Sequence, residues 1–103
     1  MQVTTEILGK QATITPRCLS GLPALSEIHR IFEAIKHLPH VEHIVFDLYH
    51  IEEIDFSATH LLQLLHEKSR AHTKCLSLIN CKRPIRQMLN LSIPQCQGAL
   101  NIR

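Results

Sequence analysis

The chain has 103 residues, of which 45% are hydrophobic and 19% charged, and its formal net charge at pH 7 is +2. This composition predicts one compact globular domain, residues 1–103, and excludes the disordered and fibrous classes. The longest apolar run in its middle, Ile44-Val45-Phe46, falls far short of the roughly 20 residues of a membrane span. Polar residues also interrupt the start, where a signal peptide needs an apolar stretch. We therefore expect a cytoplasmic protein that does not insert into a membrane.

The first elements are predicted from the spacing of apolar residues. Residues 3–8 and 12–15 are rich in Val, Ile and Thr on either side of Gly9-Lys10, which predicts a hairpin of two strands. From Ala24 the apolar residues recur at steps of three and four, directly after a proline that a first helical turn tolerates. We expect an amphipathic helix there, ending near Pro39.

The rest of the chain predicts alternating strands and helices. Residues 43–48 are nearly continuously apolar, the pattern of a strand covered on both faces by helices. Residues 57 to about 71 place leucines on one broad helical face, which predicts the longest helix. Residues 75–79 predict another strand, Pro84 opens a short helix, and residues 99–102 predict an edge strand.

The predicted order is therefore β-β-α-β-α-β-α-β. Strands that alternate with helices favour right-handed crossovers and parallel pairing, while the opening hairpin adds one antiparallel pair. The predicted fold class is α/β, a single small domain with a mixed, mostly parallel sheet of about four to five strands packed with helices.

A carboxylate and a hydroxyl stand where the predicted central strand leads into the longest helix, within residues 44–65. Here the sequence resembles the STAS domain family, which includes bacterial anti-sigma factor antagonists and the cytoplasmic tails of sulfate transporters. Its members typically read apolar-apolar-Asp-Leu at a strand end, then Ile-Asp-Ser-Ser-Gly before an amphipathic helix. Residues 45–48 (VFDL) match the first part, and Ile54, Asp55 and Ser57 match the second.

The resemblance implies a non-enzymatic regulator of transcription. In the antagonists, the second serine of the motif is phosphorylated by a partner kinase that is also the anti-sigma factor, and Ser57 occupies that position. A phosphate at a helix N-terminus gains hydrogen bonds and a favourable dipole, and its added charge disrupts a docked surface. Ser57 is thus the candidate phosphorylation switch of an anti-sigma factor antagonist-like phosphoprotein. The expected partner-binding residues are Asp55, Phe56, Ser57, Ala58, Thr59 and His60.

Two departures from the family pattern keep a second function open. Phe56 stands where the motif has its first serine, and residues 16–19 (PRCL) replace a Gly-Glu-Leu-Asp-like tetrad. Both departures suit an accessory subunit resembling the standalone STAS component of phospholipid-trafficking ABC transporters, which docks on an ATPase and needs no phosphorylation. Ser57 also suits the N-cap position of the helix, and that role is compatible with phosphorylation.

Catalytic and metal sites are disfavoured. Asp55, Ser57 and His60 have the residue types of a catalytic triad, but they are crowded along one short segment without a nucleophile elbow. Eight histidines raise the question of metal binding, yet Pro39 breaks any helix that would align the three histidines around it. We expect no enzyme activity, no metal site and no cofactor.

The last third of the chain is basic, because residues 68–103 contain no carboxylate. Surfaces that bind single-stranded nucleic acid interleave basic residues with aromatic residues on which the bases stack. The aromatic residues of this chain all precede this group of basic residues, so we expect no nucleic acid partner. A solvated surface is the preferred interpretation. The basic residues concerned are Lys68, Arg70, Lys74, Lys82, Arg83 and Arg86. The four irregularly spaced cysteines are expected to be reduced thiols in small apolar slots.

Overall fold

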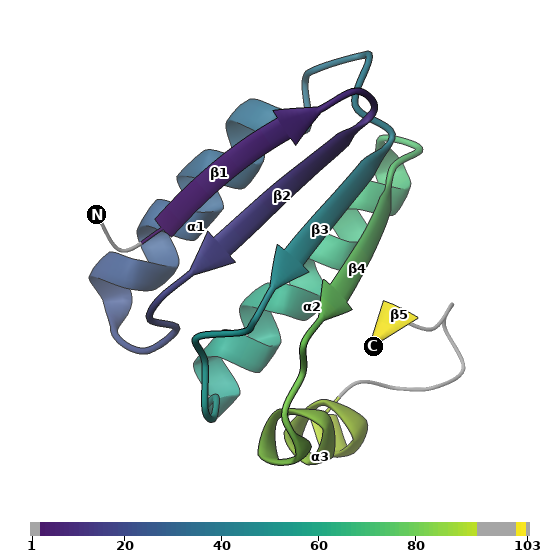
Figure 1. The fold of residues 1–103 in the computed structure, drawn as a ribbon. Coiled ribbons are helices and arrows are strands. Elements are labelled where there is room, and N and C mark those ends of the chain that lie inside the picture. The colour runs from purple at the N-terminus through teal and green to yellow at the C-terminus, as the bar shows by residue number, and fades with distance from the viewer. Residues whose placement is uncertain (1–2, 93–100, 103) are drawn as a thin grey trace.

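The computed structural model describes residues 3–92 and 101–102, and within them strands and helices follow the predicted order (Figure 1). The strands are β1 (Val3–Leu8), β2 (Gln11–Pro16), β3 (His43–Asp47), β4 (Cys75–Ile79) and β5 (Asn101–Ile102). The helices are α1 (Leu22–Ile35), α2 (Phe56–Ala71) and α3 (Arg83–Ser92).

The sheet has the strand order β1-β2-β3-β4-β5. Strands β1 and β2 pair antiparallel, and each later neighbour pairs parallel, so the prediction of a mixed, mostly parallel sheet is confirmed. Residues 99–100, where the last strand was predicted to start, lie outside the described residues.

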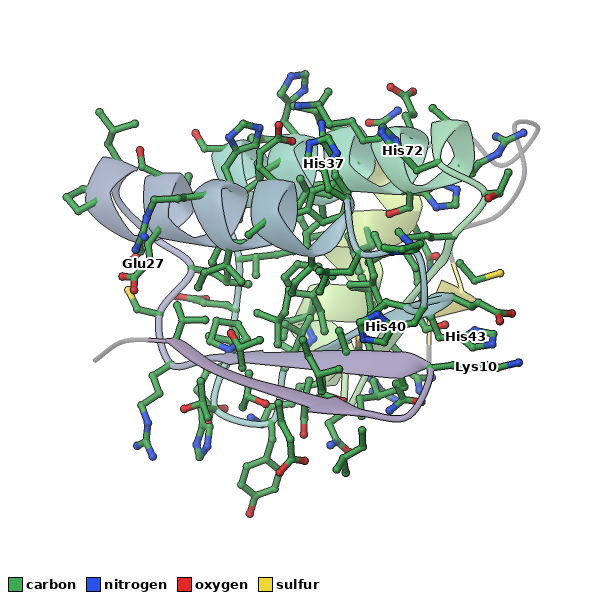
Figure 2. The ribbon with its side chains drawn as sticks, turned by 90° about the horizontal axis from the view of Figure 1, so that it is seen from above. Lys10, Glu27, His37, His40, His43 and His72 are labelled. Atoms are coloured by element: carbon green, nitrogen blue, oxygen red, sulfur yellow. The ribbon has the colours of Figure 1, made fainter. Side chains whose placement is uncertain are left out.

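Helices α1 and α2 lie side by side on the same face of the sheet (Figures 1 and 2). The prediction that helices cover both faces of the central strand is therefore wrong. The prediction failed at Val45, which is apolar and only 9% exposed although it points to the face without helices α1 and α2 (Figure 1). Thr13 and Ser77 are its partners on the neighbouring strands, and their side chains flank it.

The hydrophobic core fills the space between the sheet and the helices. Phe46 is fully buried at its centre, with the fully buried Ile14 and Leu78 as its register partners on the adjacent strands. Helices α1 and α2 contribute side chains spaced at three and four residues, as an amphipathic helix requires. These are Ala24, Ile28, Phe32 and Ile35 from α1, and Ala58, Leu62 and Leu65 from α2.

Helix α1 begins earlier and ends earlier than its sequence predicts. Gly21 precedes it with φ of 87°, a left-handed conformation that glycine adopts without strain, and Pro23 lies in the first turn. The helix ends at Ile35, and the chain then closes a turn in which the Leu38 N–H donates to the Ile35 carbonyl at 2.9 Å. A residue before proline disfavours helical geometry, so Leu38 cannot extend the helix to Pro39.

Glu33 forms ion pairs with two lysines, and one of these pairs connects α1 to α2. Its carboxylate lies 2.9 Å from Nζ of Lys36, the C-cap residue that follows α1, and 3.2 Å from Lys68 Nζ of α2. The hydrogen bond from Lys36, reinforced by the one from Lys68, lowers the pKa of Glu33 from 4.5 to about 2. Because the folded-state pKa is the lower one, the stability gained from the charged form is complete above pH 4.5 and is lost as the pH falls towards 2.

Glu33→Gln should therefore lower the Tm at neutral pH, and its difference from the wild type should shrink as the pH falls from 4.5 to 2. Thermal melts followed by circular dichroism across this range measure the effect. Glu27→Gln is the matched control, because the ion pair that Glu27 forms among the described residues stays within α1, with Arg30 at 3.9 Å. Equal pH profiles for the two variants would show that the link between the helices contributes nothing.

No helix within residues 3–92 is long and apolar enough to cross a membrane.

Candidate functional site

The loops that follow the parallel strands meet at one edge of the sheet (Figure 1). Each of the strands β2, β3 and β4 leads from this edge into a helix, so the starts of α1, α2 and α3 lie on the same side of the molecule. In open α/β sheets, binding sites are commonly built outside the carboxyl ends of the strands. The motif residues of the sequence fall at this edge, at the start of α2.

Asp55 is the N-cap of α2. Its backbone is extended, with φ of −100° and ψ of −179°, and its Oδ1 accepts a hydrogen bond from the Ala58 N–H at 2.9 Å. The alternative interpretation of Ser57 as the N-cap is therefore wrong. Ser57 is the second residue of the helix, and it is exposed.

The first turn of α2 exposes only part of the predicted partner-binding segment. Ala58 and Thr59 are buried, and the Thr59 hydroxyl donates back to the Asp55 carbonyl at 3.0 Å. Their side chains face the core, so they cannot contribute directly to an outer surface. The exposed members are Asp55, Phe56, Ser57 and His60, which we call the α2 surface.

Phe56 is the most unusual residue of the α2 surface, because its side chain is 73% exposed. Two other large hydrophobic residues are exposed at the same edge of the sheet, Leu22 at the start of α1 and Tyr49 in the loop before α2. A large apolar side chain in water gains free energy when a partner covers it. Several such side chains at one edge are typical of a protein-binding surface.

The β3–α2 loop, residues 48–55, is fastened to the β4–α3 loop. Asp47 Oδ1 accepts hydrogen bonds from the Tyr49 N–H at 3.1 Å and from Asn80 Nδ2 at 2.8 Å. Asn80 has φ of 56°, a left-handed conformation that asparagine tolerates better than most residues. The roles of Tyr49 and Asn80 were not predicted from the sequence. The contact of Asn80 joins it to a residue 33 positions away and therefore leaves no local pattern.

Charged residues surround the β3–α2 loop. A shallow hollow of about 190 Å³ lies between this loop and residues 17–20, with Arg17 and His50 lining it together with Glu52 and Glu53. The hollow is therefore lined by a positive charge from Arg17 and by the carboxylates of Glu52 and Glu53 from the β3–α2 loop.

The histidines do not form a metal site in the part of the chain that the structure describes, where no three metal-ligating side chains of His, Cys, Asp or Glu gather. His40, His43 and Lys10 lie at the amino-terminal edge of the parallel strands, away from the start of α2 (Figure 2). The His37 and His72 rings make an edge contact with centroids 5.9 Å apart.

The basic residues of the last third do not form one patch. Lys74 is buried beside the start of β4, where its Nζ donates to the Leu38 and Val41 carbonyls. Lys82 follows the other end of β4, and Lys68 is engaged with Glu33.

The described cysteines form no disulfide, but only one of them fits the expected apolar slot. Cys81 is buried, whereas Cys18 is half-buried and Cys75 is exposed. Cys96 lies outside the described residues.

Comparison with known structures identifies the fold. The chain is similar to the solved structure of the anti-sigma factor antagonist SpoIIAA in its unphosphorylated form, with a TM-score of 0.73 over 98% of this chain and 86% of that chain. The identity is 14%, so the likeness concerns the fold. No family model and no curated protein sequence matches the chain. The chain therefore has a STAS-like fold, as its motif residues predicted.

Proposed function

We propose that this protein is a non-enzymatic, anti-sigma factor antagonist-like regulator of transcription that acts in the cytoplasm. It binds a protein partner, an anti-sigma factor that is also a serine kinase, through the α2 surface. The observation that carries the proposal is the first turn of α2, where an exposed hydroxyl stands beside an aromatic ring that is 73% exposed. The STAS-like fold and the antagonist whose structure it resembles support the same class of function.

Ser57 is the proposed phosphorylation switch. Its place as the second helical residue puts an attached phosphate next to backbone N–H groups that have no partner inside the helix, and the positive end of the helix dipole favours the charge. The modification adds about −1.5 to −2 charges to a surface that already carries Asp55 and neighbours Glu53, while the carboxylate of Glu52 is paired with Lys82 at 3.4 Å. Phosphorylation would thus leave α2 folded and make the α2 surface too hydrated and too negative for its partner.

Incubation with the cognate kinase and ATP, followed by mass spectrometry, tests this switch. We expect one phosphate on Ser57, and we expect Ser57→Asp to weaken partner binding by about tenfold or more. Ser26→Asp is the matched control, because Ser26 is an exposed helical serine on α1. No phosphate on Ser57 together with unchanged binding of Ser57→Asp would remove the switch.

A second candidate function is favoured by Phe56. An exposed aromatic ring allows docking that does not depend on phosphorylation, as expected for an accessory subunit that binds the ATPase of a phospholipid-trafficking ABC transporter. Arg17 also favours this second function, because it stands where the antagonist pattern has acidic residues. Affinity purification separates the two functions: an ATPase recovered with its permease supports the transporter role, and a kinase or anti-sigma factor supports the regulatory one.

A further inference from the structure

Lys82 directs its ammonium group at one short stretch of the β3–α2 loop. Its Nζ lies 2.6 Å from the Tyr49 carbonyl oxygen, 3.1 Å from the Ile51 carbonyl oxygen and 3.4 Å from a carboxylate oxygen of Glu52. A lysine ammonium has three N–H donors, and these three acceptors match them in number. The same nitrogen lies 5.7 Å from the centroid of the Tyr49 ring, a distance at which a cation is attracted to the ring face.

We propose that Lys82 is a positioning residue for the α2 surface: its ammonium holds the β3–α2 loop in the shape from which α2 begins. The two carbonyls belong to residues two apart and accept from the same ammonium, so these charge-assisted hydrogen bonds hold the backbone at residues 49 and 51 in one arrangement. Ile51 and Ile54, which follow along the loop, are buried and lead directly to the Asp55 cap. A loop that opens at residues 49–52 therefore shifts the residues that set the start of α2.

The position of Lys82 is a poor one for α3 taken alone. Its carbonyl accepts the Arg86 N–H at 3.0 Å, so Lys82 is the residue before the first turn of α3, and that turn contains no acidic residue. A cation at a helix N-terminus opposes the helix dipole, and serine or aspartate would cap the helix better. The contacts of Lys82 with the β3–α2 loop compensate for this unfavourable interaction with the helix dipole, and a positioning role requires such compensation.

Residue-resolved amide exchange by NMR tests the inference without any partner. The reporters are amides that donate hydrogen bonds within the loop and at the start of α2: Tyr49 to Asp47 Oδ1, Ile51 to the Leu48 carbonyl, and Ala58 to Asp55 Oδ1. In Lys82→Met, exchange at these amides should rise about tenfold, while amides in the middle of α2 keep their rates. The ring resonances of Tyr49, the one tyrosine in the chain, should shift as well.

Two further variants make the result specific. Arg83→Met removes a neighbouring cation from the same helix start and should leave the loop amides unchanged. Lys82→Arg keeps a cationic donor and should restore most of the protection. Equal exchange rates in Lys82→Met and Arg83→Met would overturn the proposal. So would a Lys82→Met chain that does not fold, because loss of a partly exposed positioning residue leaves the core intact.

The link to binding rests on the proposed function. With the partner recovered by affinity purification, Lys82→Met should bind about tenfold more weakly than Arg83→Met. Faster loop exchange with unchanged affinity would overturn the positioning role. If the wild-type chain binds neither a kinase nor an ATPase, the proposed function fails, and exchange at the Ala58 amide still decides the inference.

Discussion

Replacing Phe46 by alanine should lower the free energy of unfolding by about 3–5 kcal/mol, measured by urea denaturation. The side chain is fully buried between Ile14 and Leu78, its register partners on the two neighbouring strands. The strands on both sides prevent the site from collapsing around the missing ring, so the variant loses both the transfer free energy and the contacts around the cavity. Since domains of this size are stable by about 5–15 kcal/mol, a large part of the total is at stake.

Phe56→Ala is the matched control for this prediction. It removes the same ring from a position that is 73% exposed, so the free energy of unfolding should change by no more than about 0.5 kcal/mol. A loss above about 1 kcal/mol in this control would mean that the Phe56 ring is packed against the protein, and the interpretation of the α2 surface would fail with it.

The order of the elements was predictable because apolar residues recur at a different spacing in helices than in strands. The leucines of α2 recur at helical spacing, and the prolines and Gly9-Lys10 mark the breaks, so neighbouring elements separate without any knowledge of the fold. The number of layers was not predictable in this way. Val45 is apolar and almost buried on the open face because Thr13 and Ser77 flank it, and a sequence cannot distinguish this cover from that of a helix.

The location of the candidate site was predictable, but its construction was not. Asp55 and Ser57 lie where a strand leads into a helix, and a short motif identifies such a junction. Whether Thr59 turns inward depends on the rotation of α2 against the sheet, which the first few helical residues do not fix. The contacts of Lys82 and Asn80 with residues near the end of β3 depend on the parallel pairing of β3 with β4, which brings two distant loops to the same edge.

Phe56→Ala should also weaken partner binding by about 2 kcal/mol or more, roughly 30-fold in Kd. Aromatic anchors dominate many interfaces because they bury a large area while ordering few torsion angles. Phe56 is well placed for this role, since its ring already projects into solvent beside Ser57 and gains its burial only in the complex. Titration of the recovered kinase or ATPase with the wild-type and variant chains measures the loss.

Leu8→Ala controls for the loss of an exposed apolar side chain in general. Leu8 is 68% exposed, nearly as much as Phe56, but it ends β1 at the opposite edge of the sheet. Its removal should leave both the affinity and the effect of Ser57→Asp unchanged. If Leu8→Ala weakened binding as much as Phe56→Ala, the partner would have to reach the amino-terminal edge of the parallel strands. Phosphorylation at Ser57 could not then act by direct repulsion alone, because a contact at that edge lies beyond the reach of one phosphate group on α2.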